Sequence, residues 1–259
     1  MRLIILTSAA SLLAMTSAFA ADAYAPSSLK DTSASPVVYN WTGFYLGANV
    51  GGGWSQLDSS TTFDSVNAGF DPGDSVTLRH TNAASGIVGG GQAGFNWQTG
   101  SFLLGVESDF GFIGVSQTRD IVSGSIGGTG FGLGTTQDGG FLADVTGRAG
   151  YVSGPALFYV KGGWAYLDGK AAIHISPAID GVGASKTGFG GWTLGGGIEY
   201  ALSPAWSIKG EYQYFDFGSF DLTPDPKNNP KIVINNDLSV NVVRVGLNYH
   251  VGGGYSPLK

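Results

Sequence analysis

The chain contains no cysteine among its 259 residues. Disulfide bonds and thiolate metal sites therefore cannot hold its fold together. Charged residues are also scarce, at 12%, and the formal net charge is −6. So few lysines and arginines argue against a nucleic-acid-binding protein, which requires a basic surface. Beyond the first twenty residues, no run reaches the roughly 18 to 20 apolar residues that a transmembrane helix needs.

The beginning of the chain has the features of a secretory signal peptide. Arg2 provides a positive start, residues 3–15 are mostly apolar, and Ala18-Phe19-Ala20 fits the small-x-small cleavage rule. We expect residues 1–20 to be removed on export; the alternative, an uncleaved anchor, has only a short apolar stretch to support it. Residues 21–42 are rich in Ala, Ser and Pro, which is typical of a flexible leader.

Eight segments of alternating apolar and small-or-polar residues follow, and the links between them alternate between short and long. A transmembrane barrel built from up-and-down hairpins leaves this trace, since every second residue faces lipid. We therefore predict an all-β fold, an eight-stranded antiparallel up-and-down transmembrane β-barrel with four long outer loops and short periplasmic turns. The barrel would cover residues 43–250 in the cell outer membrane, with both termini periplasmic and a glycine-rich C-terminal tail at 251–259. The expected strands are 43–54, 86–97, 102–113, 140–151, 156–168, 188–200, 206–217 and 238–250.

Charged residues within these segments fall on the parity opposite to the apolar residues. In the third segment, for example, Val106 and Phe110 alternate with Glu107 and Asp109. A charge without a partner is costly in a low-dielectric interior, so a near-balanced set is what a barrel lumen requires. A soluble, lipocalin-like barrel would have the reverse polarity. The predicted lumen charges are Glu107, Asp109, Asp144, Arg148, Lys161, Glu199, Lys209, Glu211 and Arg244.

The six tryptophans all lie at or near segment ends. Amphipathic rings prefer the membrane interface, so we expect two aromatic girdles. The predicted girdle residues are Trp54, Trp97, Trp164, Trp192 and Trp206.

Eight strands leave an interior only wide enough for side chains to fill. This width disfavours a continuous channel but leaves a narrow passive pore as an alternative.

Three motifs carry a resemblance to a known family. They are NWTGFYLGANVGGGW at 40–54, FLLGVESD at 102–109 and VRVGLNY at 243–249. The chain resembles the small outer-membrane β-barrel family of alphaproteobacteria, which includes immunogenic and haemin-binding proteins of the porin family. The resemblance implies a structural barrel that contributes to envelope integrity and displays surface loops. It also implies outer-membrane lipid, lipopolysaccharide and the barrel-assembly machinery as partners. Such barrels usually end with an aromatic residue at the end of the chain. In this chain Tyr249-His250-Val251 stands in that place, and a glycine-rich tail comes after it.

Because some members of this family are reported to bind haemin, capture of haemin or another ligand by the outer loops is a second alternative. Haem needs an axial ligand such as histidine, and His80 and His174 fall in the expected outer loops. The competing interpretation is that both are ordinary solvated histidines. Ser85, His80 and Asp74 share one loop, but nothing in their spacing marks a catalytic triad. We therefore predict no enzymatic activity and no resident cofactor or metal.

Overall fold

The computed structural model describes residues 38–64, 75–126, 129–176, 183–222, 232–251 and 254–256. Every regular element in these ranges is a strand, and among them no helix is long and apolar enough to cross a membrane. The predicted signal peptide, and the predicted leader up to residue 37, lie outside the described residues. The strands are β1 Val38–Asn40, β2 Gly43–Asp64, β3 Ser75–Thr99, β4 Phe102–Gly114, β5 Ser116–Ile126, β6 Thr129–Ser153, β7 Ala156–Ser176, β8 Gly183–Ala201, β9 Trp206–Leu222, β10 Ile232–Val251 and β11 Gly254–Ser256.

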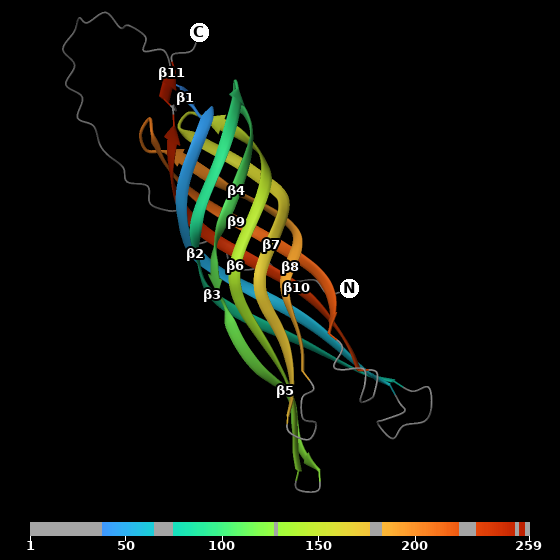
Figure 1. The fold of residues 1–259 in the computed structure, drawn as a ribbon. Helices are drawn as coiled ribbons and strands as arrows, with labels where there is room; N and C mark the ends of the chain where they lie inside the picture. The colour runs from blue at the N-terminus through green and yellow to red at the C-terminus, as the bar shows by residue number, and fades with distance from the viewer. Residues whose placement is uncertain are drawn as a thin grey trace, which may run out of the picture. The chain divides into compact units, whose positions relative to one another are not determined.

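The long strands form a closed antiparallel ring of eight (Figure 1). Its order is β4-β3-β2-β10-β9-β8-β7-β6, and the ring closes because β6 also pairs with β4. β5 continues β4 past Val115 and pairs with β6, so β4 and β5 act as one wall strand. The predicted eight-stranded antiparallel barrel is confirmed. Full closure removes the unpaired sheet edges that could not be tolerated in lipid.

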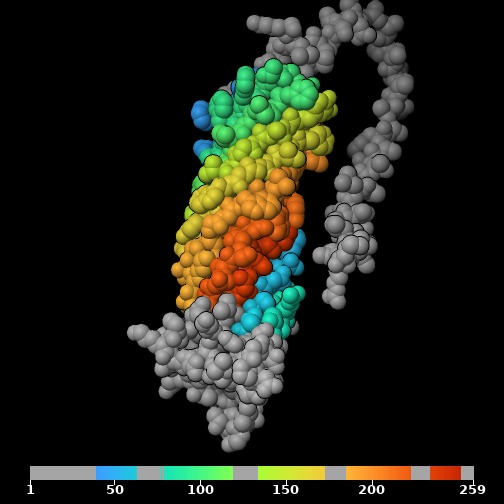
Figure 2. Space-filling view, turned by 90° about the vertical axis from the view of Figure 1, so that its right-hand side faces the viewer, coloured from blue at the N-terminus to red at the C-terminus, as the bar shows by residue number. Residues whose placement is uncertain are grey.

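Side chains alternate across the wall through most of each strand, with large apolar residues outside. In β4, Phe112 is 66% exposed while its neighbour Ile113 is 2% exposed. Figure 2 shows neighbouring strands as adjoining oblique bands on one face of the barrel. Because the exposed parity is apolar, the outside of the barrel is suited to a hydrocarbon environment and not to water.

Three tight links define what we call the turn end of the barrel. They join β3 to β4 at 100–101, β6 to β7 at 154–155 and β8 to β9 at 202–205. Gly100 and Gly154 have φ values of 60° and 59°, which residues with a Cβ rarely adopt. The opposite end, where the strands run on much further, is called the loop end.

The strands are longer at the loop end than the sequence analysis predicted. β2 continues to Asp64 and β3 already begins at Ser75, so much of the segment expected to be the first outer loop is strand. The prediction relied on an apolar outward parity. That signal stops where the strands leave the bilayer, because polar residues then suit both faces.

The ring also opens at the loop end. The β3–β4 ladder ends at the pair Ile87 and Gly114, and the β8–β9 ladder ends at Trp192 and Asp216, although the strands continue. Beyond these pairs, β3-β2-β10-β9 form one sheet and β5-β6-β7-β8 form another. The two groups of strand ends diverge in Figure 1.

The end of the predicted leader and part of the predicted tail are not irregular. β1 and β11 pair antiparallel, with Tyr39 opposite Tyr255. β1 comes directly before β2 in the chain, and β11 comes directly after β10. β2 and β10 are neighbours in the barrel, and their pairing ends at Phe44 and Val251. The short sheet therefore extends the seam between β2 and β10 past the turn end. Its pairing gives these residues a fixed partner, which composition alone did not indicate.

Candidate functional site in the barrel lumen

The nine charges expected in the lumen all lie on the buried parity, and each is 4% exposed or less. They come from six strands and are brought to one level of the barrel by the antiparallel register. For example, Arg148 lies opposite Lys161, and Asp109 lies opposite Asp144. Five acids and four bases thus share one water-poor space, where an unpaired charge would be costly.

Glu107 of β4 is the hub of this group. Its carboxylate lies 2.7 Å from Lys161 Nζ, 3.3 Å from Lys209 Nζ and 3.4 Å from an Arg148 Nη atom. Arg148 also reaches Glu199 at 3.0 Å. On the other side, Arg244 pairs with Glu211 at 2.6 Å and with Asp109 at 3.2 Å. Each base therefore contacts at least two carboxylates, and the charges form a connected network.

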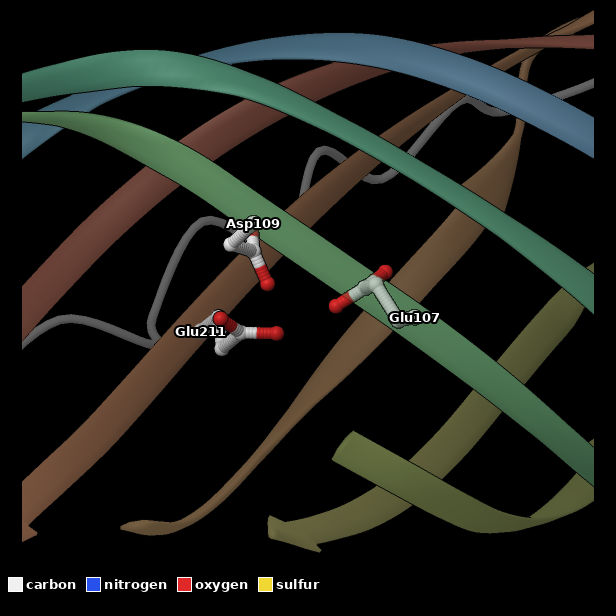
Figure 3. A group of neighbouring side chains, drawn as sticks. All are labelled: Glu107, Asp109 and Glu211. Atoms are coloured by element: carbon white, nitrogen blue, oxygen red, sulfur yellow. The ribbon is translucent and has the colours of Figure 1, made fainter. Parts of the chain in front are cut away.

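Three of these acids also form a potential set of metal ligands. Oxygen atoms of Glu107, Asp109 and Glu211 lie within 4.8 Å of one another, and Figure 3 shows the three carboxylates converging from β4 and β9. The Lys161 ammonium lies 2.7 Å from Glu107, 2.6 Å from Asp109 and 3.2 Å from Glu211. It therefore fills the position that a cation would take. The arrangement fits an internal ion-pair cluster and does not favour a metal site.

Neutral polar residues complete the network and were not among the predicted site residues. The Tyr45 hydroxyl donates to Glu107 at 2.6 Å, and the Tyr159 hydroxyl donates to Glu211 at 2.6 Å. The Gln213 amide donates to Asp144 at 3.1 Å, and the Gln92 amide donates to Asn248. These residues share the inward parity, which was visible in the sequence. Because their side chains are neutral, however, a search for charges alone passes over them.

An apolar layer lies in the lumen in addition to the charged one. Leu57, Phe189, Phe215, Phe217 and Leu238 belong to one buried apolar cluster of the barrel interior. The sequence analysis expected a polar lumen, so this layer was missed. Phe215 follows Lys209, Glu211 and Gln213 on the same parity of β9, and this switch from charged to aromatic residues was the available signal.

The turn end is closed by aromatic residues from the end of the leader. Tyr39 is 0% and Trp41 1% exposed, and they pack in one cluster with Leu103 and Leu157. The Trp41 backbone N–H donates to Gln98 Oε1 at 2.8 Å, and the Tyr39 hydroxyl donates to the Pro204 carbonyl at 3.0 Å. Since Gln98 lies next to the end of β3 and Pro204 lies between β8 and β9, the end of the leader is hydrogen-bonded to two separate parts of the rim.

His250 connects this aromatic cap to the charged layer. Its ring lies 5.4 Å from the Trp41 ring, and its Nε2 lies 2.8 Å from Ser207 Oγ. Ser207 in turn donates to Glu199 at 2.5 Å. The three side chains are 4% exposed or less, so this Ser, His and Glu group is closed to a substrate.

Two of the spaces between these layers are very small. One internal cavity, lined by residues that include Asn49, Asp109 and Arg244, measures about 10 Å³. A second, lined by residues that include Leu57, Gln137 and Phe189, also measures about 10 Å³. Each volume is close to that of a single water-sized probe. Neither of these two spaces is large enough to pass a solute.

The five predicted girdle tryptophans all point outward, with exposed fractions from 40% for Trp54 to 62% for Trp97. Trp164 and Trp192 lie directly opposite each other on β7 and β8. Trp206 packs edge-on against Tyr249, with ring centroids 5.1 Å apart. Trp41, the sixth tryptophan, is the exception, because it belongs to the cap.

The two histidines proposed for haemin lie on strands and not in irregular loops. His80 lies on β3 opposite Ser59, and its Nε2 atom is buried without a hydrogen-bond partner in the described part of the chain. His174 lies on β7, opposite Gly183, and its side chain is outside the described set. The hollow next to His80 is lined by hydroxyl, amide and charged residues, whereas haem requires apolar walls.

A closed ring of eight strands with an apolar outside and a charged, filled inside defines a small outer-membrane β-barrel. The family model described as outer membrane protein beta-barrel domain matches residues 11–250, and the chain belongs to this family. It is thus a protein of the cell outer membrane.

Two relatives agree with this assignment by sequence. The 31 kDa outer-membrane immunogenic protein of Brucella melitensis is 34% identical over 253 residues, which cover 96% of this chain and 99% of that protein. The 22 kDa outer membrane protein of Rhizobium leguminosarum is 33% identical over 186 residues, covering 72% and 69% of the two chains. Among solved structures, OprG of Pseudomonas aeruginosa matches with a TM-score of 0.43 at 13% identity, covering 81% of this chain and 97% of that one.

Proposed function

We propose that this protein is a closed structural barrel that contributes to envelope integrity and displays its loop-end strands and loops outside the cell. The filling of the lumen supports this proposal most directly. The aromatic cap, the ion-pair network and the apolar layer occupy the interior, and two of the spaces between their side chains measure only about 10 Å³ each. A barrel filled in this way has no room for a solute path.

In this proposal the turn end faces the periplasm and the loop end faces outward. Short turns on the periplasmic side and longer outer segments are the usual arrangement of such barrels. The similar Brucella protein is named as immunogenic, and surface display of the loop end would explain the same property here.

The role in the envelope can be tested with a deletion strain. Loss of the gene should increase sensitivity to detergents, and expression of the wild-type chain should restore resistance. A His80→Ala/His174→Ala variant should restore resistance equally well, because the nine lumen charges and their ion pairs are unchanged in it. Haemin titration of the same two proteins tests the alternative. Binding by the wild type that the variant loses, together with failed complementation, would replace the structural role with ligand capture.

A further inference from the structure

The wall of the barrel changes character at the loop end. Past the pairs at which the β3–β4 and β8–β9 ladders end, it consists of two sheets, β3-β2-β10-β9 and β5-β6-β7-β8. Leu57 and Leu238 of the first sheet belong to the same buried apolar cluster as Val115 and Leu167 of the second, while Asp58 is exposed on the outside. Two sheets packed in this way enclose an apolar core about 10 Å thick. The loop end is therefore built like a small β-sandwich.

A space of about 10 Å³ lies between the two sheets near this boundary. Its walls include Leu57 and Leu238 from one sheet and Val115, Leu167 and Phe189 from the other. Each of these five side chains is 5% exposed or less. The space is thus an apolar interior site that contacts both sheets.

Gln137 of β6 brings a polar atom to these apolar walls. Its side chain is 4% exposed, and its Oε1 atom is buried without a hydrogen-bond partner among the described residues. Ser55, the other buried polar side chain of the wall, already donates to the Ala84 carbonyl at 3.4 Å. A water molecule in the space would need at least two polar partners. A buried acceptor without a partner is destabilising, so Gln137 is poised to accept from a ligand.

The two sheets can move apart without breaking a ladder of backbone hydrogen bonds. In the described part of the chain, no ladder joins β3 to β5, and none joins β8 to β9 past Trp192 and Asp216. β6 and β7 are also bulged beside the space, because their ladders shift register after Asp138 and after Leu167, two residues of its wall. Gly188, opposite the second bulge, has a φ of 76°. Such bulges bend strands and are frequent at barrel rims and next to active sites.

We propose that the loop-end sheets bind a small apolar molecule that carries one hydrogen-bond donor. The apolar part lies between Leu57, Leu238 and Phe189, and an N–H or O–H group donates to Gln137 Oε1. Because packed sheets are about 10 Å apart, the ligand is no thicker than one layer of side chains, as one or two fused rings are. This class differs from haemin, whose iron needs an axial ligand. The inference goes beyond the proposed function and does not depend on a closed lumen.

Calorimetry on the refolded mature chain in nanodiscs, with the signal of empty nanodiscs subtracted, tests the proposal. The probes are indole, which has one N–H donor, and indene, which has the same shape and no donor. We expect both to bind saturably and indole to have a Kd about fivefold lower, as one hydrogen bond to a buried acceptor provides.

Two matched variants locate the recognition. In Gln137→Leu the preference for indole should disappear, and the two Kd values should agree. This variant should fold at least as well as the wild type, because it removes a buried acceptor that has no partner. The control, Gln56→Leu, changes an exposed glutamine on the outside of β2 and should keep the full preference.

Several results would overturn the proposal. Absence of saturable binding would mean that the sheets stay closed and that no ligand reaches Gln137. Equal Kd values for indole and indene in the wild type would show that Gln137 does not recognise a donor. A preference that survives in Gln137→Leu, or that is lost equally in Gln56→Leu, would place the binding elsewhere. Conductance decides the structural role separately, and a silent lumen would leave that role intact in each of these cases.

Discussion

Lys209 of β9 and Glu107 of β4 lie on opposite walls of the barrel, yet Lys209 Nζ is 3.3 Å from Glu107 Oε2. Four strand positions separate them in either direction around the ring. Such a contact can form only if side chains cross the whole lumen. It joins the two halves of the wall directly and is the simplest sign that the interior is filled.

The two members of this pair should differ in importance, because Glu107 contacts three bases and Lys209 contacts two acids. We expect Glu107→Gln to lower the free energy of unfolding more than Lys209→Met. A double-mutant cycle, followed by urea unfolding in detergent, should give a coupling energy of about 0.5–3 kcal/mol. Additive effects of the two substitutions would show that the contact across the lumen does not stabilise the barrel.

Arg148 supports two carboxylates, Glu107 and Glu199, inside the lumen. Arg148→Ala leaves both with one base fewer, and removing one partner of a buried ion pair typically costs about 3–5 kcal/mol. Urea unfolding should report a loss of this order. The matched control, Arg79→Ala, removes an exposed arginine of the loop end and should leave the unfolding midpoint unchanged. Equal effects of the two changes would contradict the lumen assignment.

Trp41 closes the turn end from inside, whereas Trp97 is 62% exposed on the outer wall. Trp41→Ala should destabilise the barrel by about 3–5 kcal/mol, because it leaves a cavity in a packed cluster. Trp97→Ala removes a lipid-facing ring and should cost clearly less. Thermal unfolding of both variants in lipid vesicles makes the comparison. A larger loss for Trp97 would mean that the cap does not stabilise the fold.

Gly163 and Gly147 lie on neighbouring strands but differ in the space around them. A Cβ at Gly163 would meet the Val145 carbonyl oxygen at 2.0 Å, while a Cβ at Gly147 would meet nothing within 4 Å. Gly163→Ala should therefore reduce the yield of refolded barrel strongly, and Gly147→Ala should refold like the wild type. Refolding into detergent, followed by far-UV circular dichroism, measures both yields. Normal refolding of Gly163→Ala would show that the wall is less tightly coiled there.

The architecture could be predicted from the sequence because the outer surface of the barrel must be apolar. This requirement places apolar residues at every second position and the charged residues on the opposite parity. Each of the nine charges from Glu107 to Arg244 could be assigned to a face in this way. Other features depend on contacts between distant segments. Trp41 looks like a girdle residue until Gln98 and Leu103 are brought next to it. The loop-end extension of β2 and β3 has no apolar parity, so local alternation could not reveal it.

The ion-pair partners of the individual lumen charges could not be predicted from the local sequence pattern either. Charge balance required that Glu107 be paired, but it did not indicate which of the four predicted lumen bases reach its carboxylate. Strand order and register bring Lys161, Lys209 and Arg148 to its carboxylate from three different strands. The aromatic switch at Phe215 was also visible in the sequence, but its meaning became clear only when Phe189 and Leu238 were found beside it.

The central claim is that side chains close the lumen, and planar-bilayer conductance of the refolded mature chain tests it most directly. The network around Glu107 and Lys209, together with the cap at Trp41, predicts no current above that of the empty bilayer. A steady ion current that scales with the amount of inserted protein would contradict the account. It would show that the interior is a narrow pore and that the barrel is not a closed structural element.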